Sequence, residues 1–275
     1  MGIGLLIGGA VVALVGFFLW MSKSKKEGKN AILSVTETSK ISEVNENFES
    51  MRSSMGNGNF THFCEIKGVA FSDSPITSEL AKKQVVYYSS KVVHEYERLE
   101  TKKDSNGNTT KSWVKKSDVV SDNTNWASGF GVKDESGFIL IDPAKAELHA
   151  IQIHSNFEKG QPNADALVKF KIGGVSFGIG DTTPDKRTIG YRYTETAIPL
   201  NQNLYVLGDA NDREGRLMVS KPKDTKQPFI VSTKSETELA GDLGSAIKGL
   251  KIGAYICWGL GAGLAVFGLI KMIMP

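Results

Sequence analysis

The sequence GIGLLIGGAVVALVGFFLW, at residues 2–20, contains nineteen residues and no charged side chain. As a helix it would be about 28 Å long, close to the ~30 Å thickness of the hydrocarbon core of a bilayer. Because only a helix satisfies its own backbone hydrogen bonds inside lipid, the run predicts a transmembrane helix over residues 1–22. It has neither a charged n-region nor a convincing cleavage site, so we expect a retained anchor rather than a cleaved signal peptide.

A second uncharged run, IGAYICWGLGAGLAVFGLI at residues 252–270, predicts another transmembrane helix over residues 248–271. Both runs contain glycines four positions apart, namely Gly4 and Gly8 in the first and Gly259 and Gly263 in the second. This spacing lets helix backbones approach closely, so we expect the spans to pack on each other or on copies of the chain. The alternative is that glycine is simply frequent in membrane helices.

Lysines near the ends of the two runs indicate which side of the membrane the intervening residues occupy. On the domain side these are Lys23, Lys25, Lys26, Lys29, Lys248 and Lys251. On the opposite side there is Lys271. Because basic flanks are retained on the cytoplasmic side, the domain is predicted to face the cytoplasm.

The charge of the intervening residues excludes several partner classes. The sequence has 33 basic and 30 acidic residues and a net charge of +3. Five lysines flanking the spans and Glu27 account for the excess, which leaves 28 basic and 29 acidic residues between positions 28 and 250. A nucleic-acid-binding domain is normally basic, so we expect no nucleic-acid partner. Two cysteines, Cys64 and Cys257, are too few for a disulfide-stapled scaffold or a multi-cysteine zinc module.

The basic segment after the first span leads into a helical pattern, and together they form a juxtamembrane region over residues 23–59. Within the helical pattern of residues 30–59, one face carries the apolar residues Ile41, Val44, Phe48 and Met51. The Gly-Asn-Gly-Asn cluster at 56–59 is a helix stop. The stripe is too short for a typical coiled coil, so we expect a helix docked on its own domain; a stalk that lifts the domain off the bilayer is the alternative.

After Phe60 the apolar period changes to two, which predicts strands. One hairpin is expected from 91–97 and 113–120 through the turn at 104–108, and another from 129–133 and 138–141. Further strands are expected at 151–154, 167–172, 188–197, 204–210, 216–220 and 229–232. Many short strands at this spacing predict a mainly β domain of the α+β class over residues 60–247, an antiparallel β sandwich or barrel-like fold with flanking helices. A capping box from Ser235 to Glu238 opens the helix that leads into the second span.

No motif predicts a catalytic residue, a cofactor or a metal. The glycine-rich segment 171–181 lacks the Lys-Ser/Thr of a phosphate-binding loop, so we expect tight turns there. The four histidines show no ligand spacing; they are His62, His94, His149 and His154. For a binding surface, the glycines of 173–181 and an aromatic expected to be exposed, Trp126, suggest the loops around them as an accessible rim.

The order of these segments resembles a known family. The segments that carry the resemblance are FCEIKGVA (63–70), VVYYSSKVVHEYE (85–97), Trp113, FILIDPAKAEL (138–148), NLYVLGDA (203–210) and the helix entering the second span. Together these segments resemble the GIDE domain, also called the BAM ("beside a membrane") domain, of the mitochondrial E3 ubiquitin ligases named GIDE or MAPL. The resemblance covers residues 60–270 and the flanking two-span plan.

The resemblance implies ubiquitin transfer, but only through a RING finger, which those enzymes carry after their second span. A RING binds two zinc ions through eight Cys and His ligands, whereas this sequence holds two Cys and four His and stops at Pro275. We therefore expect a RING-less, prokaryotic member, with no catalytic or zinc residue carried over. The GIDE domain of the family faces the mitochondrial intermembrane space, which makes an extracytoplasmic domain the alternative to the placement that the lysines predict.

We therefore expect a two-pass membrane protein whose GIDE-like domain binds an unknown protein or ligand as a sensor or scaffold, without its own catalytic centre. The first alternative is a ligase-related protein that works through a separate RING-type or effector partner. A hydrolase assembled from scattered polar loop residues is the second.

Overall fold

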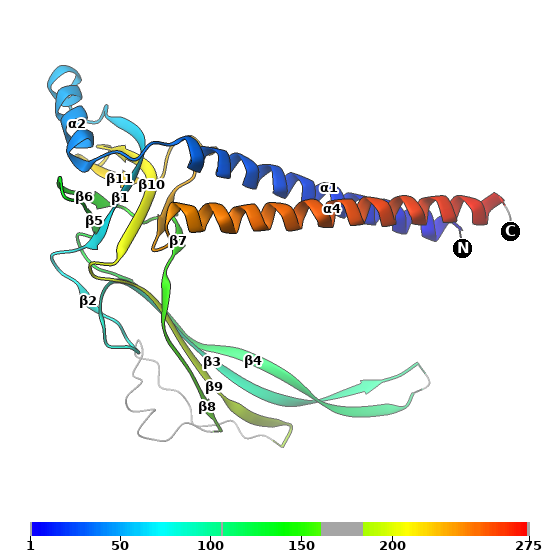
Figure 1. The fold of residues 1–275 in the computed structure, drawn as a ribbon. Helices are drawn as coiled ribbons and strands as arrows, with labels where there is room; N and C mark the ends of the chain where they lie inside the picture. Colours follow the sequence, from blue (N-terminus) through cyan, green and yellow to red (C-terminus); the bar gives the residue numbers. More distant parts are fainter. Residues whose placement is uncertain (1, 106, 161–183, 274–275) are drawn as a thin grey trace.

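A computed structural model of the chain describes residues 2–105, 107–160 and 184–273. It has two parts, a β-rich domain and a pair of long helices that leave the domain together (Figure 1). The two chain ends lie close to each other at the end of the helix pair that is far from the domain (Figure 1).

The helix pair consists of α1 (Gly2–Val35) and α4 (Glu236–Ile273). Both are long and apolar enough to cross a membrane. Large apolar side chains on both, such as Ile7 and Leu260, are about 60% exposed, which a water-soluble surface does not tolerate over such a length. The two helices therefore fit a membrane protein. The predicted capping box is confirmed, because the Ser235 amide donates to Glu238 over 2.8 Å and the Glu238 amide to the Ser235 hydroxyl over 3.3 Å.

The helical pattern predicted as one helix over residues 30–59 is two helices, α1 and α2 (Ile41–Met55). The prediction of a single helix was wrong because residues 36–40 bind the sheet instead: Thr38 forms a β-bridge with Glu65, and the Ser39 amide donates to the Glu65 carbonyl over 2.8 Å. Docking of α2 on its own domain is confirmed, since its apolar face lies in the domain core. The helix ends at Gly56, which has a φ of +80°.

One sheet has seven strands and closes on itself. Its ring runs β1 (Thr61–Phe71), β5 (Gly131–Lys133), β6 (Phe138–Ile141), β11 (Met218–Ser220), β10 (Asn203–Asn211) and back to β1. From β10 it continues to β12 (Ile230–Ser232) and β7 (Glu147–His149). The barrel-like prediction is confirmed. The pairs β6–β11 and β7–β12 are parallel, which the prediction of an antiparallel domain did not include.

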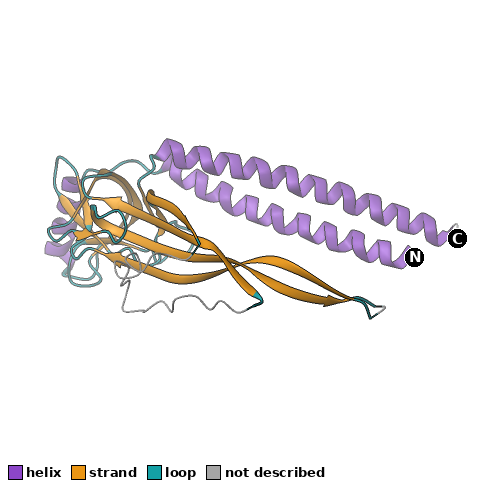
Figure 2. Cartoon of the chain, turned by 90° about the horizontal axis from the view of Figure 1, so that it is seen from below, coloured by secondary structure: helices purple, strands orange, loops and turns teal. Residues whose placement is uncertain are grey.

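A second sheet of five strands extends from this barrel. Its order is β2 (Ile76–Thr77), β3 (Gln84–Lys103), β9 (Lys186–Pro199) and β8 (Ile151–Lys159), and β4 (Thr109–Trp126) also pairs with β3. The first predicted hairpin is therefore confirmed and is longer than expected. Its far part projects as a two-stranded ribbon in the same general direction as the helix pair (Figures 1 and 2).

The short strands β2 and β7 were missed because two or three residues give no readable period. The second predicted hairpin is confirmed as β5 and β6, and its strand ends before Asp142-Pro143 as expected. The predicted strand 167–172, the glycine-rich segment 171–181 and Asn106 of the first turn lie outside the described residues.

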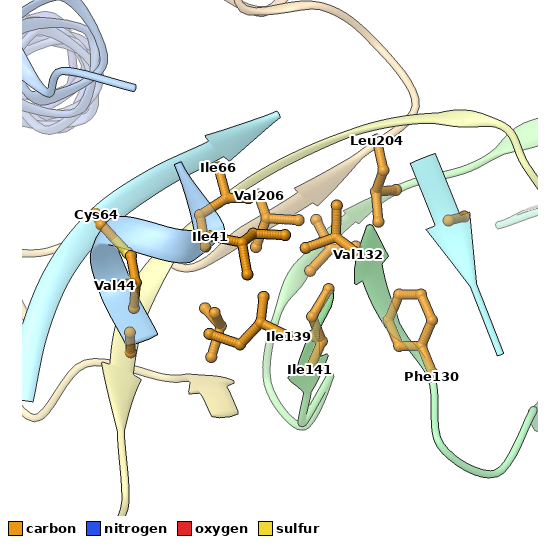
Figure 3. Close-up of a cluster of buried hydrophobic side chains, with 14 of the residues drawn as sticks. Ile41, Val44, Cys64, Ile66, Phe130, Val132, Ile139, Ile141, Leu204 and Val206 are labelled. Carbon is orange, nitrogen blue, oxygen red and sulfur yellow. The ribbon is translucent and has the colours of Figure 1, made fainter. Parts of the chain in front are cut away.

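The barrel core holds side chains from both its own strands and α2. Figure 3 shows Ile41 and Val44 of α2 lying against Ile66, Val206 and the β6 side chains. The neighbouring positions of β1 and β10 point outward, towards the helix pair. The barrel therefore has an inner apolar face and an outer face that is available to the membrane helices.

Candidate functional site

The barrel meets the membrane helices at a buried apolar contact, which we call the junction. The last turns of α1 and the first turns of α4 pack against the outer face of β10 and β12. The buried residues of this contact are Leu33, Tyr205, Leu207, Ile230, Leu239 and Leu243. Because both helices contact the barrel, the domain is fixed relative to the helix pair rather than tethered by flexible linkers.

A polar network lies within the junction and is centred on Glu65, whose side chain is only 1% exposed. Its carboxylate accepts hydrogen bonds from the Thr38 hydroxyl over 2.5 Å and the Tyr205 hydroxyl over 2.8 Å, and lies 2.8 Å from the Lys67 ammonium. Lys67 in turn pairs with Glu236 over 2.9 Å. The network thus joins the α1–α2 linker, two barrel strands and the first turn of α4.

Two members of this network, Tyr205 and Lys67, have fixed protonation states at neutral pH. Burial, followed by the hydrogen bond to Glu65, raises the pKa of Tyr205 above its usual range. Burial alone would lower the pKa of Lys67, but its hydrogen bonds with Glu65 and Glu236 outweigh that effect and raise it. Tyr205 therefore stays neutral and Lys67 stays charged. This arrangement suits a structural connector and not a general acid or base, which needs a pKa near the working pH.

A second ion cluster links α1 to β7. The Glu147 carboxylate lies 2.5 Å from the Lys29 ammonium and 3.1 Å from the His149 imidazole. The hydrogen bond from His149 and then the Lys29 contacts lower the pKa of Glu147 to about 2, although burial acts in the opposite direction. His149, one of the four histidines without ligand spacing in the sequence, thus has a carboxylate partner here. A lysine of the basic segment is therefore bound to the domain itself.

A groove of about 1060 Å³ opens beside the junction. It is bounded by the start of α2, β1, the β5–β6 turn, the β9–β10 turn and the start of α4. Four lysines line it: Lys40, Lys67, Lys133 and Lys234. Four acidic residues line it as well: Asp134, Glu135, Glu236 and Glu238. Charges of both signs therefore line the groove in equal number.

Asp134 fixes one wall of the groove. Its carboxylate accepts hydrogen bonds from the Ile41 amide at the start of α2 over 3.0 Å and from the Ser136 amide over 2.7 Å. Burial alone would raise its pKa, but these donors outweigh it and the pKa of Asp134 is lowered. The β5–β6 turn and the N-terminus of α2 are therefore held together by a permanent anion.

Trp126 was predicted to lie on an exposed rim, and this was wrong. Its ring is half-buried against the core and packs on Tyr87 and Phe130, with ring centroids 4.3 Å and 5.1 Å away. It does line a smaller cavity of about 300 Å³. The other half of that predicted rim, residues 173–181, lies outside the described residues.

The four glycines predicted to pack the spans lie elsewhere on the helix surfaces. A Cβ added at Gly4, Gly8, Gly259 or Gly263 would meet nothing within 4 Å. The helices instead approach at positions seven residues apart, which are Gly2, Gly9 and Gly16 in α1 and Gly261 and Gly268 in α4. A seven-residue repeat is the seam of a coiled helix pair and was the signal that could have found them. A role for the first four in contacts between copies of the chain stays a prediction.

Within the described part of the chain, no group of three or more His, Cys, Asp or Glu side chains could hold a metal ion. Burial raises the pKa of the Cys64 thiol to about 12, so it does not ionise to a nucleophile at neutral pH. His94 stacks on Tyr191 and lies 3.0 Å from the Thr188 hydroxyl, and burial lowers its pKa. The groove and the junction are therefore the candidate site, as surfaces for binding.

Comparison with protein families adds the decisive observation. The model of the GIDE family, described as E3 Ubiquitin ligase, matches residues 97–267, which is more than half of the chain. The chain belongs to the GIDE family. The match confirms the resemblance seen in the sequence. It covers the barrel strands from β5 onward and most of α4, and therefore part of the groove and part of the junction; α1, the start of α2 and β1, which supply the rest of both, precede residue 97. Curated proteins and solved structures give no significant match.

Proposed function

We propose that this GIDE-family protein is a membrane-apposed scaffold whose groove binds a segment of a partner protein. The observation that carries the proposal is the junction, where the barrel is fixed to both membrane helices by buried apolar contacts and by the Glu65 network. A domain fixed in this way presents its groove at a constant height and angle to the bilayer. Pre-organisation of this kind lowers the entropic cost of binding.

Site-specific photo-crosslinking in native membranes tests the groove. A photoreactive residue is placed at Glu135 or Asn203, which are exposed in the groove, and as a control at Asn57, which is exposed in the α2–β1 turn. We expect a discrete protein adduct from the two groove positions and none from Asn57. Lys133→Glu should weaken the adduct at both groove positions. Adducts of the same size from Asn57, or none from the groove, would overturn the proposal.

The family description supports a second candidate, in which the domain acts in ubiquitin transfer through a separate RING-type partner. The two cysteines and four histidines of the sequence are fewer than the eight ligands of a RING, so the partner would supply the zinc centre. Purified full-length protein should then transfer ubiquitin only when such a partner is added, and should contain no zinc by itself. Transfer by the isolated protein, with bound zinc, would contradict both candidates.

We further propose that the domain faces the cytoplasm. Lys23, Lys26 and Lys29 follow the first span on the domain side, and Lys271 is the basic residue beyond the second. A single cysteine introduced at Asn57, in the Cys257→Ala background, should react with a membrane-impermeant maleimide only after the membrane is opened. Labelling in intact cells or spheroplasts would place the domain on the outer side, as the mitochondrial relatives suggest.

A further inference from the structure

Basic residues are concentrated at the far end of the β3–β4 hairpin, residues 98–116, which we call the arm. The arm has two acidic residues, Glu100 and Asp104. It has six basic residues: Arg98, Lys102, Lys103, Lys111, Lys115 and Lys116. The near-neutral charge of the domain as a whole therefore conceals one strongly basic projection.

The acidic residues of the arm are already engaged. Glu100 pairs with Lys116 over 2.7 Å, and Asp104 holds the turn by accepting a hydrogen bond from the Asn108 amide over 2.8 Å. In the part of the chain that the structure describes, the other four arm lysines form no ion pair; they are Lys102, Lys103, Lys111 and Lys115. Their charges are available to a partner.

The strand register places three of these lysines on one face of the arm. Lys103 lies opposite Thr109, Thr101 opposite Lys111, and Glu97 opposite Lys115, so all six share that face. Trp113, opposite Leu99, lies between Lys111 and Lys115 on the same face and is 38% exposed. The Arg187 guanidinium lies over the Trp113 ring at 4.3 Å. One face of the arm therefore combines an exposed indole with several cations.

The lengths of α1 and of the hairpin show whether this face could reach a membrane crossed by the helix pair. Trp20 clusters with Tyr255 and Trp258, with ring centroids 6.2 Å and 5.5 Å from its own, and marks the domain-side interface of the bilayer. From Met21 to the end of α1 is fifteen residues, or about 22 Å of helix. From Tyr87 to Lys103 the hairpin is about 55 Å long, and it projects alongside the helix pair (Figures 1 and 2). The arm is therefore long enough to reach the membrane surface.

We propose that the arm lies against anionic lipid headgroups, with the Trp113 face towards the bilayer. Its charges exclude it from the hydrocarbon, while tryptophan is favoured at the headgroup level and each basic residue near an anionic surface adds about 1 kcal/mol of attraction. A nucleic acid would also attract the lysines, but the position of the arm beside the two spans favours the lipid surface. The arm is then a third point of membrane contact, which sets the tilt of the domain.

Full-length protein reconstituted in vesicles tests the proposal. A solvent-sensitive fluorophore is attached to Thr101→Cys on the Trp113 face, in the Cys257→Ala background. The matched control is Ser112→Cys, which is also exposed and lies opposite Glu100 on the other face of the arm. In vesicles containing about a third phosphatidylserine, we expect headgroup-level nitroxide lipids to quench the label at position 101 more strongly than the label at 112. Vesicles of phosphatidylcholine alone should remove the difference.

Charge variants then show whether the lysines of the Trp113 face are responsible for the lipid contact. Lys103, Lys111 and Lys115 changed together to glutamine should weaken the contact about a hundredfold and abolish the response to phosphatidylserine. The same triple change at Lys221, Lys223 and Lys226, which are exposed in the β11–β12 loop, should leave it intact. Both leaflets have one composition in these vesicles, so the outcome is independent of the side on which the domain lies in the cell.

The proposal is overturned if quenching at position 101 is the same in both vesicle types, or if it persists in the Lys103, Lys111 and Lys115 triple variant. A label at position 101 that responds to added heparin or oligonucleotide and not to vesicle composition would assign the face to a soluble polyanion instead. Because none of these measurements involves the groove, a negative result would not bear on the proposed scaffold function.

Discussion

Two buried glutamates organise different parts of the domain, Glu65 at the junction and Glu195 in the second sheet. At the junction, Glu65 is satisfied by side chains from segments far apart in the sequence, Thr38, Lys67 and Tyr205. At the root of the second sheet, Glu195 of β9 is satisfied mostly by backbone: the amides of Glu79, Leu80 and Ala81 donate to it over 2.8–2.9 Å. The Glu65 carboxylate therefore connects separate segments of the fold, whereas the Glu195 carboxylate holds one stretch of backbone.

Glu195 fixes a single loop, the one that follows β2, onto the sheet from which the arm extends. Burial alone would raise the pKa of Glu195, but the backbone amides and the Ser90 hydroxyl, at 3.0 Å, outweigh it and lower the pKa. Glu65 instead couples the α1–α2 linker to the first turn of α4 through Lys67. A carboxylate satisfied by backbone shapes one loop, whereas one satisfied by side chains can transmit a change between a membrane helix and the barrel.

The largest expected effect is at Glu195. Glu195→Leu would remove the acceptor for three partly buried amides and the buried Ser90 hydroxyl, so we expect a loss of about 3–5 kcal/mol in the free energy of unfolding. Urea unfolding of the full-length protein in detergent, followed by near-UV circular dichroism, measures it. Glu195→Gln retains the shape and one acceptor oxygen and should cost about half as much. Equal stability of the leucine variant and the wild type would show that the loop is held by other contacts.

The next largest effect on stability is expected in the helix pair of α1 and α4. A Cβ at Gly9 would lie 2.7 Å from the Gly261 carbonyl, so Gly9→Ile should separate the helices and cost about 2 kcal/mol, as overpacking typically does. The near-UV circular dichroism signal that arises from the Trp20–Trp258 contact should also decrease in the Gly9→Ile variant.

Gly4→Ile is the matched control, since a Cβ there meets nothing within 4 Å, and it should leave the unfolding midpoint unchanged. If Gly4→Ile instead lowers the oligomeric mass measured by light scattering, the prediction that Gly4 packs against copies of the chain is supported. If Gly4→Ile is as destabilising as Gly9→Ile, the seven-residue seam is not the contact between the helices.

Features set by local periodicity could be predicted from the sequence, because their causes lie within a few residues. The apolar runs, the Ile41–Val44–Phe48 face of α2 and the Ser235–Glu238 capping box all belong to this class. The family could be recognised for the same reason, since it rests on the order of such segments. The seam between the spans was missed although the seven-residue spacing of Gly2, Gly9 and Gly16 can be seen in the sequence, because Gly4 and Gly8 show a four-residue spacing in the same helix.

Features set by pairing of distant segments could not be predicted. Closure of the barrel depends on the parallel pair β6–β11, whose strands are about 80 residues apart in the sequence. Glu65 lies between Cys64 and Ile66 in its strand, and Glu195 lies between two threonines, which are positions where a solvent-facing glutamate is also found. Only the tertiary fold brings their hydrogen-bond donors. The groove is likewise assembled from five separate segments. Long-range register therefore limits what a single sequence reveals about this site.

The coupling role of Glu65 can be measured as a double-mutant cycle. We expect Glu65→Leu to cost about 2 kcal/mol and Tyr205→Phe about 1 kcal/mol, because each leaves a buried partner unsatisfied. The double variant should cost less than the sum of these losses, with a coupling of at least 0.5 kcal/mol, as residues in one network show. The exposed Glu49–Arg52 pair of α2 is the control and should show a coupling near zero. Additive losses at Glu65 and Tyr205 would mean that the junction is held by its apolar contacts alone.

The smallest expected effect is the pH dependence of the Lys29–Glu147 pair. The pKa of Glu147 is lowered from 4.5 to about 2 in the folded protein, so its stabilising contribution is complete above pH 4.5 and is lost as the pH falls towards 2. Its side chain is half exposed, which limits the contribution to less than about 1 kcal/mol. Unfolding midpoints of the wild type and of Glu147→Gln should therefore differ slightly at pH 6 and converge at pH 2. A difference that stays constant over that range would show that Glu147 acts through packing, and the link between α1 and β7 would then not depend on charge.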